Sequence, residues 1–265
     1  MIDTHTHLYL SEFCADGDSP GAAVDRAVEA GVTTLVMPNV DITTIGPMKK
    51  LADERPEAVR LAMGLHPTEL GDDWRAAVDR IETELRAPGR YKYVAVGEVG
   101  IDLYWDDTQR DEQMLAFDRQ AQLAAELQLP LIIHCRDGLD ETLEVLEGLP
   151  KAPPAIVMHC FGGSAADVDT IRRRASAVPE IYFGIGGVVT FKKSTLPDTL
   201  PAIGLDHIVL ETDSPYLAPV PKRGRRNESA YLTYTASAIA GKMGISVDNV
   251  NSITTANARR LFPRL

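Results

Sequence analysis

The chain begins with Ile2-Asp3-Thr4-His5-Thr6-His7, a short β-type run that ends in two histidines. Residues two apart on a strand point to the same side, so His5 and His7 should present a pair of imidazoles at the end of this strand. Similar short β-rich runs, each followed by a longer amphipathic run, recur along the chain. This alternation is typical of βα units around a parallel sheet.

Eight such units are present, and the 265 residues suit one (β/α)8 barrel, which typically has about 250 residues. Helices are expected after the strands, most clearly at residues 73–86, 109–127, 230–243 and 247–261. The sequence shows no linker, low-complexity tract or boundary to a second domain. The expected strands are residues 1–7, 33–39, 59–66, 93–98, 131–135, 156–160, 181–185 and 207–213.

Polar residues at the strand ends distinguish a closed barrel from an open, doubly wound sheet. Nearly all residues that could bind a metal or take part in catalysis lie at the carboxyl ends of the expected strands. In a closed barrel these ends meet at one face, whereas an open sheet would spread them apart. We therefore predict an α/β fold of the (β/α)8 TIM-barrel type, with residues 1–265 forming a single domain.

Histidines give the clearest indication of a site. Five of the six lie at the carboxyl end of an expected strand, whereas His207 lies at the start of one. A single histidine in such a place is most often a hydrogen-bonded core or surface residue. Five at equivalent positions indicate a shared site instead. The five are His5, His7, His66, His134 and His159.

Glu98 and Asp213 add carboxylates at the ends of the fourth and eighth expected strands. Four histidines and two acids exceed the roughly three protein ligands that one catalytic ion takes. We therefore predict two divalent cations bridged by Glu98, a pair that would activate a water and stabilise both the attacking and the leaving oxygen. Glu98 and Asp213 are predicted to be catalytic as well as metal-binding. The bridge would join His5, His7 and Asp213 on one side to His134 and His159 on the other.

Seven motifs extend this pattern over essentially the whole chain. They are Ile2-Asp3-Thr4-His5-Thr6-His7, Gly64-Leu65-His66-Pro67, Val96-Gly97-Glu98-Val99-Gly100-Ile101-Asp102, Ile133-His134-Cys135-Arg136-Asp137, Met158-His159-Cys160-Phe161-Gly162-Gly163-Ser164, Glu211-Thr212-Asp213-Ser214-Pro215-Tyr216-Leu217 and Arg226-Asn227-Glu228. In this order they resemble the TatD family of metal-dependent hydrolases, a branch of the amidohydrolase-like barrels.

The resemblance implies a deoxyribonuclease that depends on Mg²⁺ or Mn²⁺, with Zn²⁺ as a further candidate. It implies a 3'-to-5' exonuclease whose substrate is the end of single-stranded DNA. In the family pattern the residues that match His5, His7, Glu98, His134, His159 and Asp213 bind the metals, and all six residue types are intact here. Thr68 and Gly163 depart from the pattern, which puts some substrate contacts in doubt.

Two candidate substrate contacts lie beside the ligands. His66 should contact the substrate or its leaving group, although a structural histidine before Pro67 is the alternative. Arg136 follows His134 by two residues, so it should point to the same side and could hold a phosphate with two hydrogen bonds. A salt bridge to a neighbouring acid is the other interpretation of Arg136.

Further candidates lie in the loops. Arg225 and Arg226 belong to the densest basic run, residues 222–226, and barrel enzymes often bind phosphate after strands seven and eight. A solvated charged loop is the alternative for this run. The glycine-rich residues 184–187 could let backbone N–H groups approach the same anion. Tyr104 and Trp105 could stack on a base or sugar, or pack beneath their loop.

Composition limits the partners. A net charge of -11 argues against tight, non-specific binding along duplex DNA but allows a grip on one strand end. The three cysteines, Cys14, Cys135 and Cys160, are too few for a disulfide framework and suit a reducing compartment. Alternation should turn Cys135 and Cys160 away from the barrel mouth. With neither a signal peptide nor an apolar span, we expect a cytoplasmic protein with no membrane association and no obligate protein partner.

Two other functions compete with the nuclease. One is a hydrolase of a small phosphoester, amide or lactone, which is mildly disfavoured because Glu98 stands where many cyclic-amide hydrolases use a carbamylated lysine. The other is a binding module without activity, since the fold does not fix the function. A complete set of buried ligands argues against it, because such groups cost stability without a metal.

Overall fold

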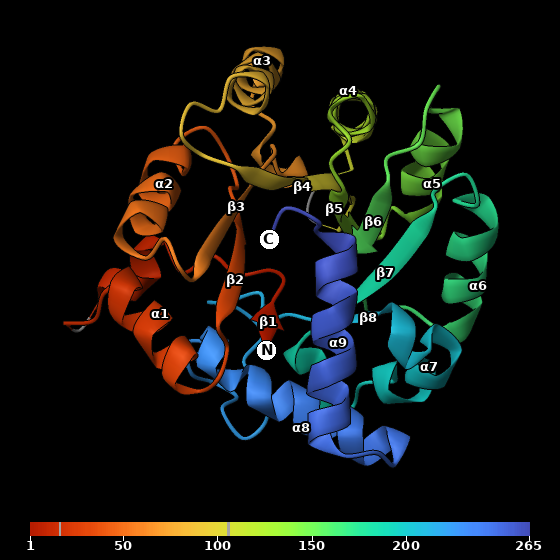
Figure 1. Ribbon diagram of the computed structural model, residues 1–265. Helices are drawn as coiled ribbons and strands as arrows, with labels where there is room; N and C mark the ends of the chain where they lie inside the picture. The colour runs from red at the N-terminus through yellow and green to blue at the C-terminus, as the bar shows by residue number, and fades with distance from the viewer. Residues whose placement is uncertain (16, 105–106) are drawn as a thin grey trace.

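The computed structural model describes residues 1–15, 17–104 and 107–265, so Trp105 lies outside the described residues. Eight parallel strands pair with one another in chain order (Figure 1). This topology confirms the prediction from the βα alternation. The strands are β1 Ile2–Asp3, β2 Thr34–Pro38, β3 Val59–Met63, β4 Tyr93–Asp102, β5 Leu131–Arg136, β6 Ala155–Met158, β7 Glu180–Ile185 and β8 Ile208–Leu210.

The barrel closes where the segment after β8 meets the segment after β1. The Thr4 amide donates to the Leu210 carbonyl oxygen at 2.9 Å, and Thr6 forms a parallel bridge with Ser214. The Asp213 amide also donates to the His5 carbonyl oxygen at 3.0 Å. The fold is therefore the predicted TIM barrel, and its closure brings the first and last ligand segments together.

Amphipathic helices surround the strands (Figure 1). In helix α3, which spans Trp74–Arg86, the buried apolar residues are Trp74, Val78, Ile81 and Leu85, and their three- and four-residue spacing predicted this helix. Among the described residues, no helix is long and apolar enough to cross a membrane. The helices are α1 Pro20–Glu29, α2 Ile45–Glu54, α3 Trp74–Arg86, α4 Arg110–Leu127, α5 Leu139–Gly148, α6 Ala165–Arg174, α7 Leu196–Ile203, α8 Leu232–Met243 and α9 Val247–Leu261.

Helix α9 covers the end of the barrel at which the strands begin (Figure 1). The end of this helix buries Leu261, and the next residue, Phe262, is fully buried. Both belong to one apolar cluster with the strand residues Val36, Val94 and Tyr182. The amino end of the barrel is therefore packed, and the opposite end carries the site.

Several strands end earlier than predicted, and they do so at the ligands. β1 ends at Asp3, β6 at Met158 and β8 at Leu210, so the ligand residues that follow lie just beyond the strands. Cys160 and Asp213 have φ values of 48° and 55°, which belong to the left-handed region and not to a strand. Period-two alternation therefore does not govern where these side chains point.

β4 is longer than predicted, because it continues past Glu98 to Asp102. Its register with β5 shifts between Val96 and Val99, which forms a bulge around Glu98. Bulges beside active sites re-aim side chains. A Cβ atom at Gly100 would lie 2.0 Å from the His134 carbonyl oxygen, so only glycine allows β4 to pair with β5 beyond the bulge.

Candidate metal centre

The first group of ligands lies where the segments after β1 and β8 meet. The Nε2 atoms of His5 and His7 are 3.0 Å apart. Glu98 Oε2 lies 3.1 Å from His5 Nε2 and 3.6 Å from His7 Nε2. Asp213 Oδ1 completes the group at 3.9 Å from His5 Nε2 and 3.6 Å from His7 Nε2. Nitrogen and oxygen atoms spaced in this way can share the coordination shell of one cation.

The other oxygen of Glu98 faces a second group. Glu98 Oε1 lies 2.9 Å from His134 Nδ1 and 3.6 Å from His159 Nε2. It also lies 3.3 Å from His66 Nε2, although the sequence analysis did not count His66 among the ligands. His66 is therefore a candidate ligand as well as the predicted substrate contact. His159 also belongs with the first group, because its ring stacks on His5 with centroids 3.4 Å apart and His5, Glu98 and His159 offer ligand atoms within 4.8 Å of one another. A carboxylate whose two oxygens face different imidazoles could bridge two ions, and the bridging role of Glu98 stays a prediction.

Buried groups behind the imidazoles fix their orientation. Asp102 Oδ2 lies 2.9 Å from His134 Nε2, and Glu211 Oε1 lies 3.1 Å from His159 Nδ1. On the other side, the Tyr9 hydroxyl lies 2.9 Å from His7 Nδ1. Partners of this kind set the tautomer of a metal-binding histidine and hold its ring in place.

Asp102 and Glu211 stand within the motifs that resemble the family, but no role was predicted for either residue. Tyr9 was missed altogether. Glu211 precedes Asp213 by two residues and Tyr9 follows His7 by two. This spacing from a predicted ligand is only a weak signal, because it does not show which imidazole each residue contacts.

Glycine residues on and after β7 make room for Glu211, the residue that contacts His159, and for the backbone of Leu217. A Cβ atom at Gly184 would lie 2.1 Å from Glu211 Oε2, and one at Gly187 would lie 2.3 Å from the Leu217 carbonyl oxygen. Close packing against Glu211 and Leu217 therefore explains these two glycines. The approach of this glycine-rich stretch to a bound anion stays a prediction.

The cluster attracts positive charge. Burial raises the pKa of Asp213 to about 6, although His159 and His7 act against this shift. Burial also disfavours charge on Glu98, but the imidazoles of His66, His5 and His159 outweigh it and hold the pKa of Glu98 well below its usual range.

Two of the imidazoles gain protons in return. Burial alone would lower the pKa of His134, but hydrogen bonds to Asp102 and Glu98 raise it to about 9. Burial likewise opposes charge on His159, whereas Glu211 and Glu98 raise its pKa to about 10. A site that draws protons onto two histidines has an excess of negative potential, which also favours cations.

The donor set fits divalent metal ions. In the part of the chain that the structure describes, all ion pairs of Glu98 and Asp213 are with imidazoles. Four groups of three ligand atoms occur here, and within each group the atoms lie within 4.8 Å of one another. A mixed nitrogen and oxygen set can bind several divalent ions, since imidazole suits Zn²⁺ and carboxylate suits Mg²⁺ or Mn²⁺.

The predicted substrate-binding arginines lie in different surroundings. Arg136 is exposed at the end of β5, and its guanidinium carbon lies 3.7 Å from the centre of the Tyr104 ring. Arg226 forms an ion pair with Asp18 and donates to the Glu12 carbonyl oxygen at 2.8 Å. Arg225 is exposed. The structure thus places Arg136 beside the ligands and ties Arg226 to the segment before α1.

Cys160 was placed wrongly by the alternation argument. It was predicted to point away from the barrel mouth, but its sulfur lies within 4.8 Å of ligand atoms of His159 and Asp213. The reason is the left-handed backbone at Cys160, two residues after the end of β6. The prediction holds for Cys135, whose sulfur accepts from the Thr142 hydroxyl of α5 at 3.6 Å.

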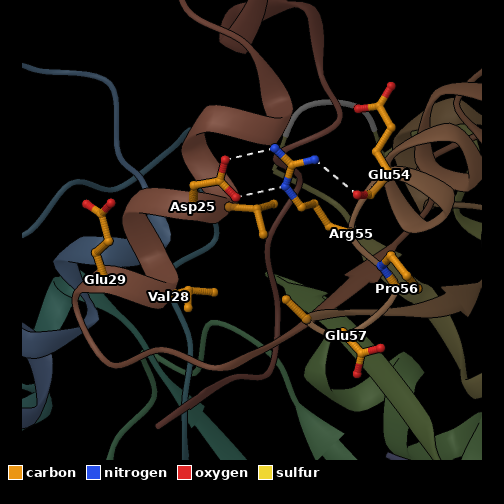
Figure 2. A pocket seen from close by; sticks show the side chains of 9 residues that line it. Asp25, Val28, Glu29, Glu54, Arg55, Pro56 and Glu57 are labelled. Carbon is orange, nitrogen blue, oxygen red and sulfur yellow. Dashed lines mark hydrogen bonds and ion pairs between the residues drawn. The ribbon is translucent and has the colours of Figure 1, made fainter.

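A separate hollow lies at the other end of the barrel, between the end of α1 and the start of β3 (Figure 2). Its volume is about 410 Å³. Arg55 lines it and forms an ion pair with Asp25 at 2.8 Å. None of the described residues that line this hollow is a histidine, and it lies away from the ligands.

Comparisons with known proteins identify the family of the chain. A family model described as "TatD related DNase" matches residues 2–263. The chain is 34% identical to the uncharacterized metal-dependent hydrolase YabD of Bacillus subtilis (strain 168), over 99% of this chain and 98% of that protein. It is 32% identical to the 3'-5' ssDNA/RNA exonuclease TatD of Erwinia billingiae (strain Eb661), over 99% and 98% of the two chains. The solved structure of YJJV, a TatD homologue from Escherichia coli K12, superposes with a TM-score of 0.87 at 28% identity, covering 100% of this chain and 98% of that one.

Proposed function

Because the chain belongs to the TatD-related DNase family and is a metal-dependent hydrolase, we propose that it is a 3'-to-5' exonuclease on single-stranded DNA. One observation carries this proposal above the others. Glu98 Oε2 lies 3.1 Å from His5 Nε2 and Glu98 Oε1 lies 2.9 Å from His134 Nδ1, so the two oxygens face different imidazoles, which suits a bridge between two divalent ions. Relatives named as exonucleases on single-stranded DNA and RNA support the substrate class.

Glu98 and Asp213 would have different roles in phosphodiester cleavage. When bound, two divalent ions would supply activation of a water and neutralisation of charge on the scissile phosphate. Glu98 would hold both ions with one carboxylate. Asp213 Oδ1 lies within reach of both ligand groups, at 3.6 Å from His7 Nε2 and 3.7 Å from His159 Nε2. Asp213 would therefore accept the proton of the attacking water.

Arg136 would hold a phosphate oxygen from the end of β5, since it is exposed two residues beyond His134. The rest of the chain offers little general attraction to nucleic acid, because its net charge is -11. Binding would therefore depend on a few local contacts at a strand end. This favours an enzyme that works at ends over one that tracks along a duplex.

The proposal is tested with oligonucleotides labelled at either end. Single-stranded DNA, single-stranded RNA and duplex DNA are incubated with protein treated with EDTA and then given Mg²⁺, Mn²⁺ or Zn²⁺. We expect metal-dependent release of nucleotides from the 3' end of single strands and slow cleavage of the duplex. His5→Ala should abolish this release. His207→Ala is its matched control and should retain it, because His207 lies outside the cluster, where its Nδ1 forms a hydrogen bond with the Ile181 carbonyl oxygen at 3.0 Å. Absence of chain shortening with every metal would exclude the exonuclease and leave the small-substrate hydrolase.

A further inference from the structure

Two half-exposed tyrosines follow the strands that lead to the metal centre. Tyr104 lies two residues beyond β4 and is 54% exposed, and Tyr216 lies three residues beyond Asp213 and is 53% exposed. A single exposed apolar side chain needs no explanation by itself. These two tyrosines differ because the backbone amide of each forms a hydrogen bond either with a candidate metal ligand or with a residue that contacts one.

Tyr216 is held directly against Asp213. Its amide donates to the Asp213 carbonyl oxygen at 2.9 Å, and its carbonyl oxygen accepts from Asn227 Nδ2 at 2.7 Å. Asn227 is fully buried and also donates to the Thr212 carbonyl oxygen at 2.8 Å. These bonds fix the backbone on both sides of the Tyr216 ring while the ring itself remains half in solvent.

Tyr104 is held in a similar way on the β4 side. Its amide donates to Asp102 Oδ1 at 3.0 Å, and the other oxygen of Asp102 lies against His134. The Arg136 guanidinium stacks on the Tyr104 ring at 3.7 Å. An aromatic ring is thus paired with the arginine that we expect to hold a phosphate.

The two rings come from opposite sides of the barrel mouth. β4 and β8 lie four strands apart in a barrel of eight, so their carboxyl ends face each other across it (Figure 1). The ligands occupy the space between them. His7 Nε2, for example, lies 3.6 Å from both Glu98 Oε2, on β4, and Asp213 Oδ1, after β8.

We propose that Tyr104 and Tyr216 stack on the nucleobases at either side of the scissile phosphate. This inference rests on the proposed function, because it needs a phosphodiester at the metal centre. Stacking on an aromatic ring is available to every base, so it gives affinity without sequence preference. A base within a duplex already has both faces covered by its neighbours. The two rings therefore select unpaired nucleotides, and they do so in a chain whose net charge is -11.

The test is a cycle that changes the protein and the substrate separately. We measure KM and kcat for the wild type, Tyr104→Ala and Tyr216→Ala on a natural single strand. The same is done on strands with an abasic nucleotide at the last or the second-last position. Each alanine variant should raise KM on the natural strand by about 5- to 100-fold. kcat should change little, because a stacked base binds equally in the ground state and the transition state.

The abasic strands identify the contact. For each tyrosine, one abasic position removes the base that stacks on its ring. That abasic strand should raise the KM of the wild type by about the same factor as the alanine variant raises it on the natural strand. It should have almost no further effect in the alanine variant, since the contact is already lost. If the increases in KM from the alanine substitution and from the abasic nucleotide multiply instead, the ring and the base do not touch and the stacking proposal is wrong.

Three control variants separate stacking from other causes. Tyr216→Phe keeps the ring and should keep the KM of the wild type, whereas Tyr216→Leu is apolar without an aromatic ring and should behave as Tyr216→Ala does. Leu115→Ala on α4 removes a side chain that is also 54% exposed, and it should leave KM unchanged. A wild-type KM in the leucine variant would overturn the proposal. A wild type that shortens no natural strand would instead overturn the proposed function itself.

Discussion

Glu98 is the residue at which the two groups of ligands meet, so its replacement should affect both. We expect Glu98→Ala to lower kcat at least about 100-fold, because the geometry of both metal sites depends on it. The barrel should still fold, but the melting temperature of the metal-free protein should fall somewhat, because the imidazoles of His66, His5 and His159 lose the carboxylate that attracts them. Activity under saturating Mn²⁺ and the melting temperature are the two measurements.

Glu84→Gln provides the comparison for Glu98→Ala. Glu84 is also buried, but it lies on α3 and pairs with Lys49 and Arg80. Its replacement should lower stability and leave turnover unchanged. Equal activity of Glu98→Ala and the wild type would exclude the bridge.

Glu211 acts through His159 and should be recognised by its effect on metal affinity. It lies 3.1 Å from His159 Nδ1 and accepts from the Cys160 amide at 2.6 Å. Loss of such a partner typically weakens metal binding by about 10- to 100-fold. We expect Glu211→Gln to raise the metal concentration for half-maximal activity by that factor, with near-normal activity at high metal. An unchanged metal dependence would show that Glu211 does not orient His159.

The loop after β8 combines two different arginines, so they should be tested separately. Arg226 is occupied by Asp18 and the Glu12 carbonyl oxygen, and its replacement would loosen the loop. Arg225 is exposed. If Arg225 holds a phosphate, Arg225→Glu should weaken oligonucleotide binding and reduce the slope of log affinity against log salt by about one. Identical slopes for variant and wild type would assign Arg225 to the solvated surface.

The elements of the fold could be predicted wherever one periodicity applied over the whole segment. The buried face of α3 is an example, and the chain order of the strands is another. The predictions failed at the ends of β1, β6 and β8, where side chains from different strands must converge on one point. The side chains of a regular strand alternate between its two faces and cannot all point to one place. The strand conformation therefore ends at these residues. Cys160 shows the result, since its left-handed φ of 48° brings its sulfur close to the metal ligands.

The convergence of the candidate ligands could be predicted from histidines and acids at strand ends, but the groups that support them could not. Asp102 and Glu211 belong to a chain with 38 acidic residues, most of which lie on the surface. Only the fold shows that these two are buried against His134 and His159. Long-range partners of this kind leave no periodic signal in the sequence.

The stability of the whole molecule should depend on pH in a way that reveals the metal. Without metal, the pKa values of His134 and His159 are raised to about 9 and 10, above the ordinary value of about 6.5. A raised pKa contributes stability that is complete below about pH 6.5 and is lost as the pH rises through the folded value. The melting temperature of the chelated protein should therefore fall between about pH 6.5 and 10.

Metal binding should show the opposite trend, because the ions must displace these protons. Apparent affinity for Mn²⁺ should rise up to about tenfold per pH unit for each proton displaced. Calorimetric titration at several pH values and in buffers of different ionisation enthalpy measures both affinity and proton release. Affinity that does not change with pH would mean that His134 and His159 bind no metal.

Anomalous diffraction from crystals grown with Mn²⁺ is the most direct measurement of the metal centre. We predict two peaks about 3.5 to 4 Å apart, one on each side of the Glu98 carboxylate. One peak should lie among His5, His7 and Asp213, and the other beside His134 and His159. A single peak, or two peaks that do not share Glu98, would contradict the bridged pair and the mechanism built on it.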